Sequence, residues 1–143
     1  MPMQEQTMVD AIMHMRSQID LLWQVFVTVQ LALFALIMIY DEAVDSLNRL
    51  ARTLALIGLG IFSYINGSAL KNAYDLLAAL HVQYKLDYGQ PGRFHDGLLK
   101  AFVNVDFSGR ETMILLTHGL AFTVVALALI VPSFVQHRQL LPK

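Results

Sequence analysis

The 143-residue chain contains no cysteine, which excludes disulfide bonds, thiolate metal sites and lipid-modified cysteines together. Charged residues are also scarce, at 15% of the chain against about a quarter in soluble domains. So few charges cannot cover the surface of a soluble globule. The formal net charge of −1 is not that of a protein that binds polyanions, so we expect no nucleic-acid partner.

Sequence patterns typical of enzymes are missing as well. The chain has neither a glycine-rich phosphate loop nor a His-Glu-x-x-His zinc motif. We therefore expect no enzyme activity, no catalytic residue and no cofactor. Glu5, Asp10 and Asp20 precede the first apolar run, where a secretory signal peptide would be basic, so we expect no cleavable signal.

Apolar sequence is abundant instead, at 56% of the chain, and it gathers in three runs without a charged residue: 21–40, 53–70 and 113–135. Each run is close to the roughly 20 residues that cross a 30 Å hydrocarbon core as a helix. Soluble helices of this length carry a polar face, which these runs lack. The sequence predicts an all-α integral membrane protein with three transmembrane helices, a single domain over residues 1–143. We expect it in an inner or plasma membrane.

Residues outside the runs are expected to extend the helices. In the segment 7–20, apolar residues recur at helical spacing, which predicts an amphipathic N-terminal extension; they are Met8, Ile12, Met15 and Ile19. The second helix is predicted to leave the bilayer over residues 71–86, with Leu76, Leu77, Leu80 and Tyr84 near one face. Gly89, Pro91 and Gly92 should end it.

Two further elements complete the expected architecture. A short connection separates the first two helices. Asp41 lies in this connection, and because aspartate is a favoured capping residue we expect it to cap the second helix. Residues 94–106 mix apolar with charged side chains, which favours an interfacial helix before the third span. Six of the ten Lys and Arg residues fall on the side of the N-terminus, so the positive-inside rule favours a cytoplasmic N-terminus.

Polar residues within the runs predict a layer at one depth in the membrane. The start of the first span, the end of the second and the start of the third share one membrane surface, and polar side chains lie near each. They are Gln24, Thr28, Ser63, Tyr64, Asn66, Thr117 and His118. An unpaired polar group in hydrocarbon costs several kcal/mol, so each should face another helix or a wet cavity.

On the second helix a stripe of small and polar residues recurs at near-heptad spacing: Gly60, Ser63, Gly67 and Lys71, with Asn66 beside them. Small residues let helix backbones approach closely in lipid, so the stripe is typical of a packing seam in which Asn66 supplies a hydrogen bond. A stripe lining a water-filled pore in an oligomer would have the same pattern.

His118 is the one histidine within a span. A neutral imidazole suits an interhelical hydrogen bond to Asn66 or Gln24, and it could also relay a proton or bind a ligand. Haem ligation by two histidines would need a partner at the same depth, which only a second copy of the chain could supply. We therefore favour a structural hydrogen bond and expect neither haem nor metal.

These features leave three functional hypotheses. The first is a non-catalytic assembly or accessory subunit of a membrane complex, which would pack against its partners through the face of Gly60, Ser63, Asn66 and Gly67. Its partners would be the lipid bilayer and either copies of itself or other membrane subunits. The second is a homo-oligomeric channel whose path is lined by Gly60, Ser63, Asn66 and Gly67. The third is a membrane redox or lipid-binding component that uses His118.

Overall fold

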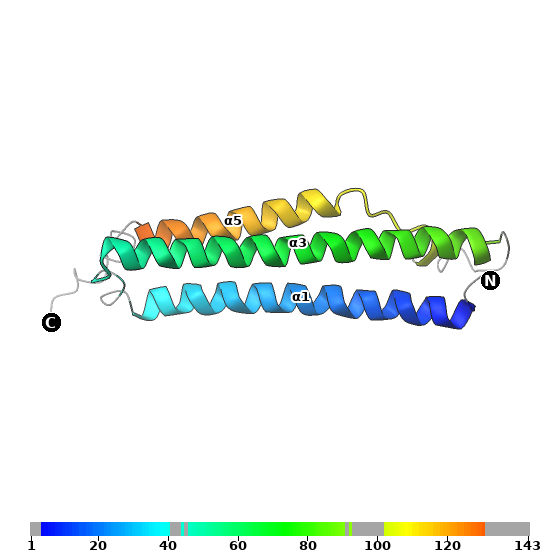
Figure 1. Ribbon diagram of the computed structural model, residues 1–143, viewed down its shortest axis with the longest axis horizontal. Helices are drawn as coiled ribbons and strands as arrows, with labels where there is room; N and C mark the ends of the chain where they lie inside the picture. Colours follow the sequence, from blue (N-terminus) through cyan, green and yellow to red (C-terminus); the bar gives the residue numbers. More distant parts are fainter. Residues whose placement is uncertain (1–3, 41–43, 45, 91, 93–101, 131–143) are drawn as a thin grey trace. The chain divides into compact units, whose positions relative to one another are not determined.

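A computed structural model of the chain describes residues 4–40, 44, 46–90, 92 and 102–130. The protein is all-helical, with three long helices: α1 (Glu5–Ile39), α3 (Arg49–Tyr88) and α5 (Arg110–Ile130) (Figure 1). Each is long and apolar enough to cross a membrane. The predicted class, an α-helical integral membrane protein with three candidate spans, is confirmed.

Two of these helices are far longer than a membrane span. No glycine or proline interrupts residues 5–39, and α1 joins the N-terminal extension to the first apolar run in one piece. The 40 residues of α3 likewise join the second run to its predicted extension. That helix ends at the glycines that the sequence indicates: a Cβ on Gly89 would lie 2.5 Å from the Lys85 carbonyl oxygen, and Gly92 has φ +81°.

The start of α3 differs from the prediction. A capping residue lies directly before the first helical residue, and Asn48 has that place ahead of Arg49. Its Oδ1 accepts a hydrogen bond from the Ala51 backbone N–H at 2.8 Å. Asp41 is therefore not the cap of this helix, and it lies outside the described residues.

The segment before α5 is described in part. Of the predicted interfacial helix 94–106, residues 94–101 lie outside the described residues, and the remainder holds only a π-helical turn at residues 102–103. Asp106 then accepts a hydrogen bond from the Ser108 backbone N–H at 2.9 Å, which holds the pKa of its exposed carboxyl below the usual value. The helix α5 begins three residues before the predicted span, and residues 131–135 of that span lie outside the description.

The chain divides into two compact units. Unit 1 comprises Met1–Trp23 and Ser68–Ile114, and unit 2 comprises Gln24–Gly67 and Leu115–Lys143. Because the boundaries fall inside helices, each long helix contributes a segment to both.

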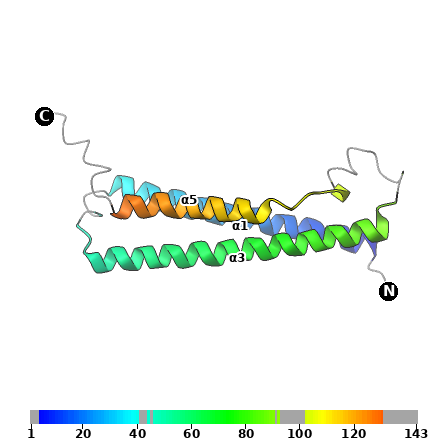
Figure 2. The same ribbon diagram turned by 90° about the horizontal axis from the view of Figure 1, so that it is seen from above.

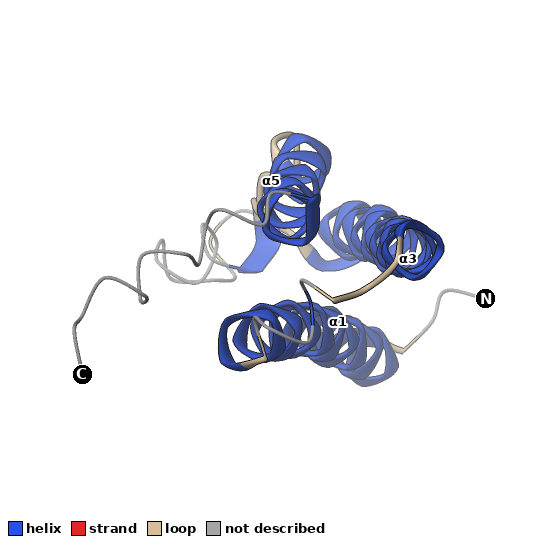
Figure 3. Cartoon of the chain, turned by 90° about the vertical axis from the view of Figure 1, so that its left-hand side faces the viewer, coloured by secondary structure: helices blue, strands red, loops and turns tan. Residues whose placement is uncertain are grey.

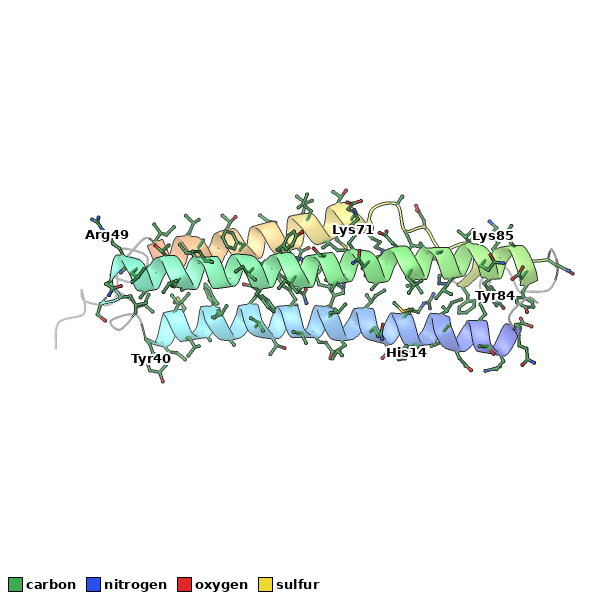
Figure 4. The ribbon with its side chains drawn as sticks, in the orientation of Figure 1. His14, Tyr40, Arg49, Lys71, Tyr84 and Lys85 are labelled. Carbon is green, nitrogen blue, oxygen red and sulfur yellow. The ribbon has the colours of Figure 1, made fainter. Side chains whose placement is uncertain are left out.

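In unit 1 the apolar stripe of α1 packs on that of α3. The predicted residues Met8, Ile12 and Ile19 are buried, and Met15 packs partly buried beside them. The facing residues of α3 include Leu70, Leu77 and Tyr84, and the Tyr84 side chain points toward α1 (Figure 4). Tyr84 Oη also donates a hydrogen bond to Glu5 Oε1 at 3.0 Å. Leu76, predicted near the same face, is half exposed and lies outside this buried cluster.

Unit 2 is a bundle of three helical segments. Seen along the helix axes, α1, α3 and α5 form the corners of a triangle (Figure 3), and α3 runs opposite to α1 and α5 (Figure 2). Ile37, Leu59, Val125 and Leu129 form its apolar core. The outer surface is apolar too, with large side chains such as Leu31, Ile61 and Leu120 exposed. Such a surface is costly in water and favourable in lipid, as expected for membrane spans.

Because the native chain has no cysteine, single introduced cysteines report topology cleanly. Ser17 and Ser46 are exposed and lie before and after the first apolar run. We expect Ser17→Cys and Ser46→Cys to react with a membrane-impermeant maleimide from opposite sides of sealed vesicles, Ser17→Cys from the cytoplasmic side. Reaction of both variants from the same side would contradict a membrane span between them.

Candidate functional site

A buried hydrogen bond joins α3 to α5 inside unit 2. Asn66 and His118 are both only 6% exposed, and His118 Nε2 lies 2.9 Å from Asn66 Oδ1. An amide oxygen only accepts, so Nε2 carries the proton and donates. Asn66 is one of the two hydrogen-bond partners, Asn66 and Gln24, that the sequence predicts for His118. Interhelical bonds of this kind contribute about 0.6–2 kcal/mol in a membrane.

An aromatic side chain of α1 covers this bond. The Phe26 ring stacks on the His118 imidazole, with ring centroids 3.8 Å apart and planes 25° apart. Phe26 also lies parallel to Phe62 of α3, at 6.4 Å between centroids. All three helices of unit 2 therefore meet around His118, whose ring has an apolar environment suited to its neutral form.

A second buried amide lies one helical turn beyond Phe26. Gln30 is 8% exposed, and neither its Nε2 nor its Oε1 has a hydrogen-bond partner among the described residues. Ser63 follows Phe62 in the chain. Its Oγ atom is also buried and has no hydrogen-bond partner among the described residues. Gln30 is not among the predicted members of the polar layer, although it lies in the middle of the run 21–40, where an amide is most costly.

The other predicted members of the polar layer lie at its edge or outside it. Thr117 is partly buried, and Gln24, Thr28 and Tyr64 are exposed on the outer surface, Tyr64 by 76%. The sequence indicated their depth along the helices, and the rotation of each helix decides which of them face inward.

Most of the predicted stripe on α3 lies toward α5. A Cβ added at Gly60 would contact the Phe122 ring at 3.6 Å, and Asn66 binds His118. In unit 1, Lys71 Nζ forms an ion pair with Glu111 Oε1 at 2.6 Å, and this hydrogen bond raises the pKa of Lys71 (labelled in Figure 4). Gly67, which lies between Asn66 and Lys71 in the sequence, is partly buried.

The described residues offer few side chains that could bind a metal ion or a cofactor. They contain no group of three His, Asp or Glu side chains close enough to hold a metal ion. His118 Nε2, a usual metal-binding atom, already donates its proton to Asn66. The arrangement is suited to holding helices together.

Unit 1 holds a polar contact between α1 and α3 that the sequence does not predict. Arg16 Nη2 lies 3.4 Å from His81 Nε2, and burial together with the Arg16 charge lowers the pKa of His81. A guanidinium only donates, so the neutral imidazole accepts. His81 shares a helical face with the apolar residues Tyr84 and Leu77, and this spacing is the signal that would have placed it inside.

Comparison of the chain with protein-family models, curated proteins and solved structures finds no match.

The Asn66–His118 bond predicts a clear pattern of stabilities. Asn66→Leu leaves a buried imidazole N–H without its acceptor, so we expect a loss of about 1–3 kcal/mol in the free energy of unfolding. Unfolding in mixed micelles, followed by circular dichroism, measures this loss. In a His118→Phe background the same substitution should cost markedly less. Equal costs in the two backgrounds would show that the pair is not coupled.

Proposed function

We propose that this protein is a non-catalytic assembly or accessory subunit of a membrane complex, which it joins by helix–helix packing. The observation that carries the proposal is a row of exposed residues on α1 that includes two polar side chains. Residues on this row recur every three or four positions; they are Gln24, Thr28, Leu31 and Ala35. We call this row the outer face of α1.

The spacing of this face resembles the seam of a helix pair. A repeat of about 3.5 residues keeps one stripe facing a partner helix over several turns. Gln24 and Thr28 are consecutive polar positions on the seam, both within the first apolar run. In lipid an amide and a hydroxyl on such a face are best satisfied by polar groups of another helix.

Thr28 differs from two other helical threonines in the hydrogen bonding of its hydroxyl. Thr53 and Thr123 each donate to the backbone carbonyl four residues earlier, at 2.9 and 2.7 Å. Neither Thr28 nor Gln24 forms a side-chain hydrogen bond with any described part of the chain. The Thr28 hydroxyl is therefore available to a partner.

The stripe on α3 was expected to contact another subunit, but its residues pack within this chain. Gly60 and Asn66 contact α5 of the same chain, which leaves the outer face of α1 as the more suitable contact with another subunit. The partner that fits is a transmembrane helix with hydroxyl or amide side chains at the depth of Gln24 and Thr28. A second copy of this chain is the alternative partner that experiment distinguishes.

A specific observation also favours the channel as a second candidate function. Gln30 and Ser63 are buried polar groups without partners among the described residues, and water molecules would satisfy them. A hydrated path beside Asn66 would run past these side chains. The apolar core of Ile37, Leu59, Val125 and Leu129 would then act as its constriction.

The leading proposal predicts that Gln24→Leu and Thr28→Leu weaken association without unfolding the chain. Each substitution removes an interhelical hydrogen bond worth about 0.6–2 kcal/mol, so we expect a roughly 3- to 30-fold loss of complex. Native mass spectrometry of gently extracted membranes measures the fraction in complexes and the masses of the partners. Thr123→Val is the matched control, since that hydroxyl is already bonded within α5. Equal losses in the control and in Thr28→Leu would contradict the proposal, and a ring of identical copies would replace the accessory subunit by a homo-oligomer.

The channel candidate predicts ion or proton flux across liposomes that contain the purified protein. Gln30→Leu removes the unpartnered amide from the path, so we expect the flux to fall at least about tenfold while helicity by circular dichroism is kept. Tyr64→Phe, on the outer surface, is the control expected to leave it unchanged. Absence of flux in the wild-type protein would remove this candidate and leave the first.

A further inference from the structure

A cavity of about 220 Å³ in unit 1 is lined by two arginines and one aspartate. Arg16 comes from α1 and Arg110 from the first turn of α5, and both line the cavity together with Asp20. Its other walls are apolar or aromatic, from Ile19, Leu77, Val105, Phe107 and Tyr74. One water needs only about 10–15 Å³ of such space, so the cavity has room for a polyatomic group.

The two guanidinium groups are held in place by aromatic rings, and neither is paired with a carboxylate among the described residues. Arg16 lies over the Phe102 ring at 5.4 Å and contacts the imidazole of His81, while Arg110 lies over the Tyr74 ring at 5.7 Å. Neither forms an ion pair with a carboxylate in the described part of the chain, where Glu111 is paired with Lys71. Aromatic faces orient a guanidinium while leaving its N–H groups free to bind an anion.

The lining has a charge pattern that a single anion does not explain. Two positive groups and the carboxylate of Asp20 share the cavity, and Asp20 is not within ion-pair distance of either arginine. His81 adds no charge near neutral pH, because burial first and the Arg16 charge second lower its pKa. Asp106 lies near Arg110 but accepts the Ser108 N–H. A ligand with a phosphate and an ammonium would match both signs.

The position of these residues along the helices matches the headgroup layer of a bilayer. Arg16 precedes the first apolar run by five residues, and Arg110 precedes the third by three. At 1.5 Å per residue these offsets are about 7.5 and 4.5 Å, against roughly 5–8 Å for the headgroup layer on each side. Trp23 Nε1 donates to Tyr74 Oη at 3.2 Å beside the cavity, and Trp and Tyr are the side chains that favour this layer.

The geometry points to a binding site for a phospholipid headgroup that carries a phosphate and a primary ammonium. Arg16 and Arg110 hold the phosphate by charge-assisted hydrogen bonds, and Asp20 receives the ammonium. The site lies outside the helix contacts on which the proposed function rests, and it would serve to fix the protein at one surface of the membrane.

The test is lipid retention by the full-length protein. The protein is purified in mild detergent, incubated with equal amounts of phosphatidylethanolamine and phosphatidylglycerol, and its bound lipids are weighed by native mass spectrometry. We expect preferential retention of phosphatidylethanolamine, and at least about a tenfold loss in Arg16→Gln and in Arg110→Gln. Arg110→Gln is the safer variant, since its guanidinium lies over the Tyr74 ring and forms no ion pair among the described residues. Asp20→Asn should keep phospholipid binding but shift the preference toward phosphatidylglycerol.

Two matched controls and two competing probes complete the experiment. Arg49→Gln and Lys85→Gln remove exposed cations elsewhere, the second on a side chain that points away from α1 (Figure 4), and both should retain the lipid as the wild type does. Soluble phosphoethanolamine should compete, and inorganic phosphate should compete weakly. Equal retention in wild type and Arg110→Gln, equal loss in the controls, or binding of inorganic phosphate without any headgroup preference would each overturn the assignment.

Discussion

The absence of hydrogen-bonding partners in hydrocarbon is the constraint on which unit 2 depends. Helices satisfy their own backbone groups, but a side-chain amide or imidazole must find its partner on another helix. The bond between Asn66 and His118 meets this demand for both residues at once. It fixes the register of α3 against α5, and the stacking of Phe26 on the imidazole brings α1 into the same contact. Three helices that would otherwise slide on apolar surfaces thereby acquire one preferred alignment.

The buried positions of α1 follow a helical spacing within each unit. In unit 1 they are Met8, Ile12 and Ile19, and in unit 2 they are Phe26, Gln30 and Ile37, at intervals of four or seven positions. What changes along the helix is the opposite face, which is polar near Asp10 and apolar near Leu31. One helix therefore packs by the same geometry in both units, with a surface suited to water at one end and to lipid at the other.

The fold class could be predicted from the sequence because hydropathy reports how deep a residue lies. In the extension of α1, polar residues alternate with apolar ones, so the inward positions Met8, Ile12 and Ile19 were identified correctly. Within an apolar run this contrast disappears, and depth alone does not tell which side chains face inward. Gln24 and Thr28 were therefore placed in the layer although they are exposed, and Gln30 was overlooked although it is buried. The pairing of Arg16 with His81 depends on tertiary contact over 65 residues, which no local pattern contains.

The contact between the start of α1 and the last part of α3 in unit 1 has a consequence for the order in which the chain folds. Glu5 and Tyr84, which share a hydrogen bond, are 79 positions apart in the sequence. During synthesis the apolar stripe of α1 therefore leaves the ribosome long before the part of α3 that will cover it. Closing so long a loop is slow compared with forming either helix, since helices need only local contacts. We therefore expect the helices to form first and the contacts between α1 and α3 in unit 1 to form after them.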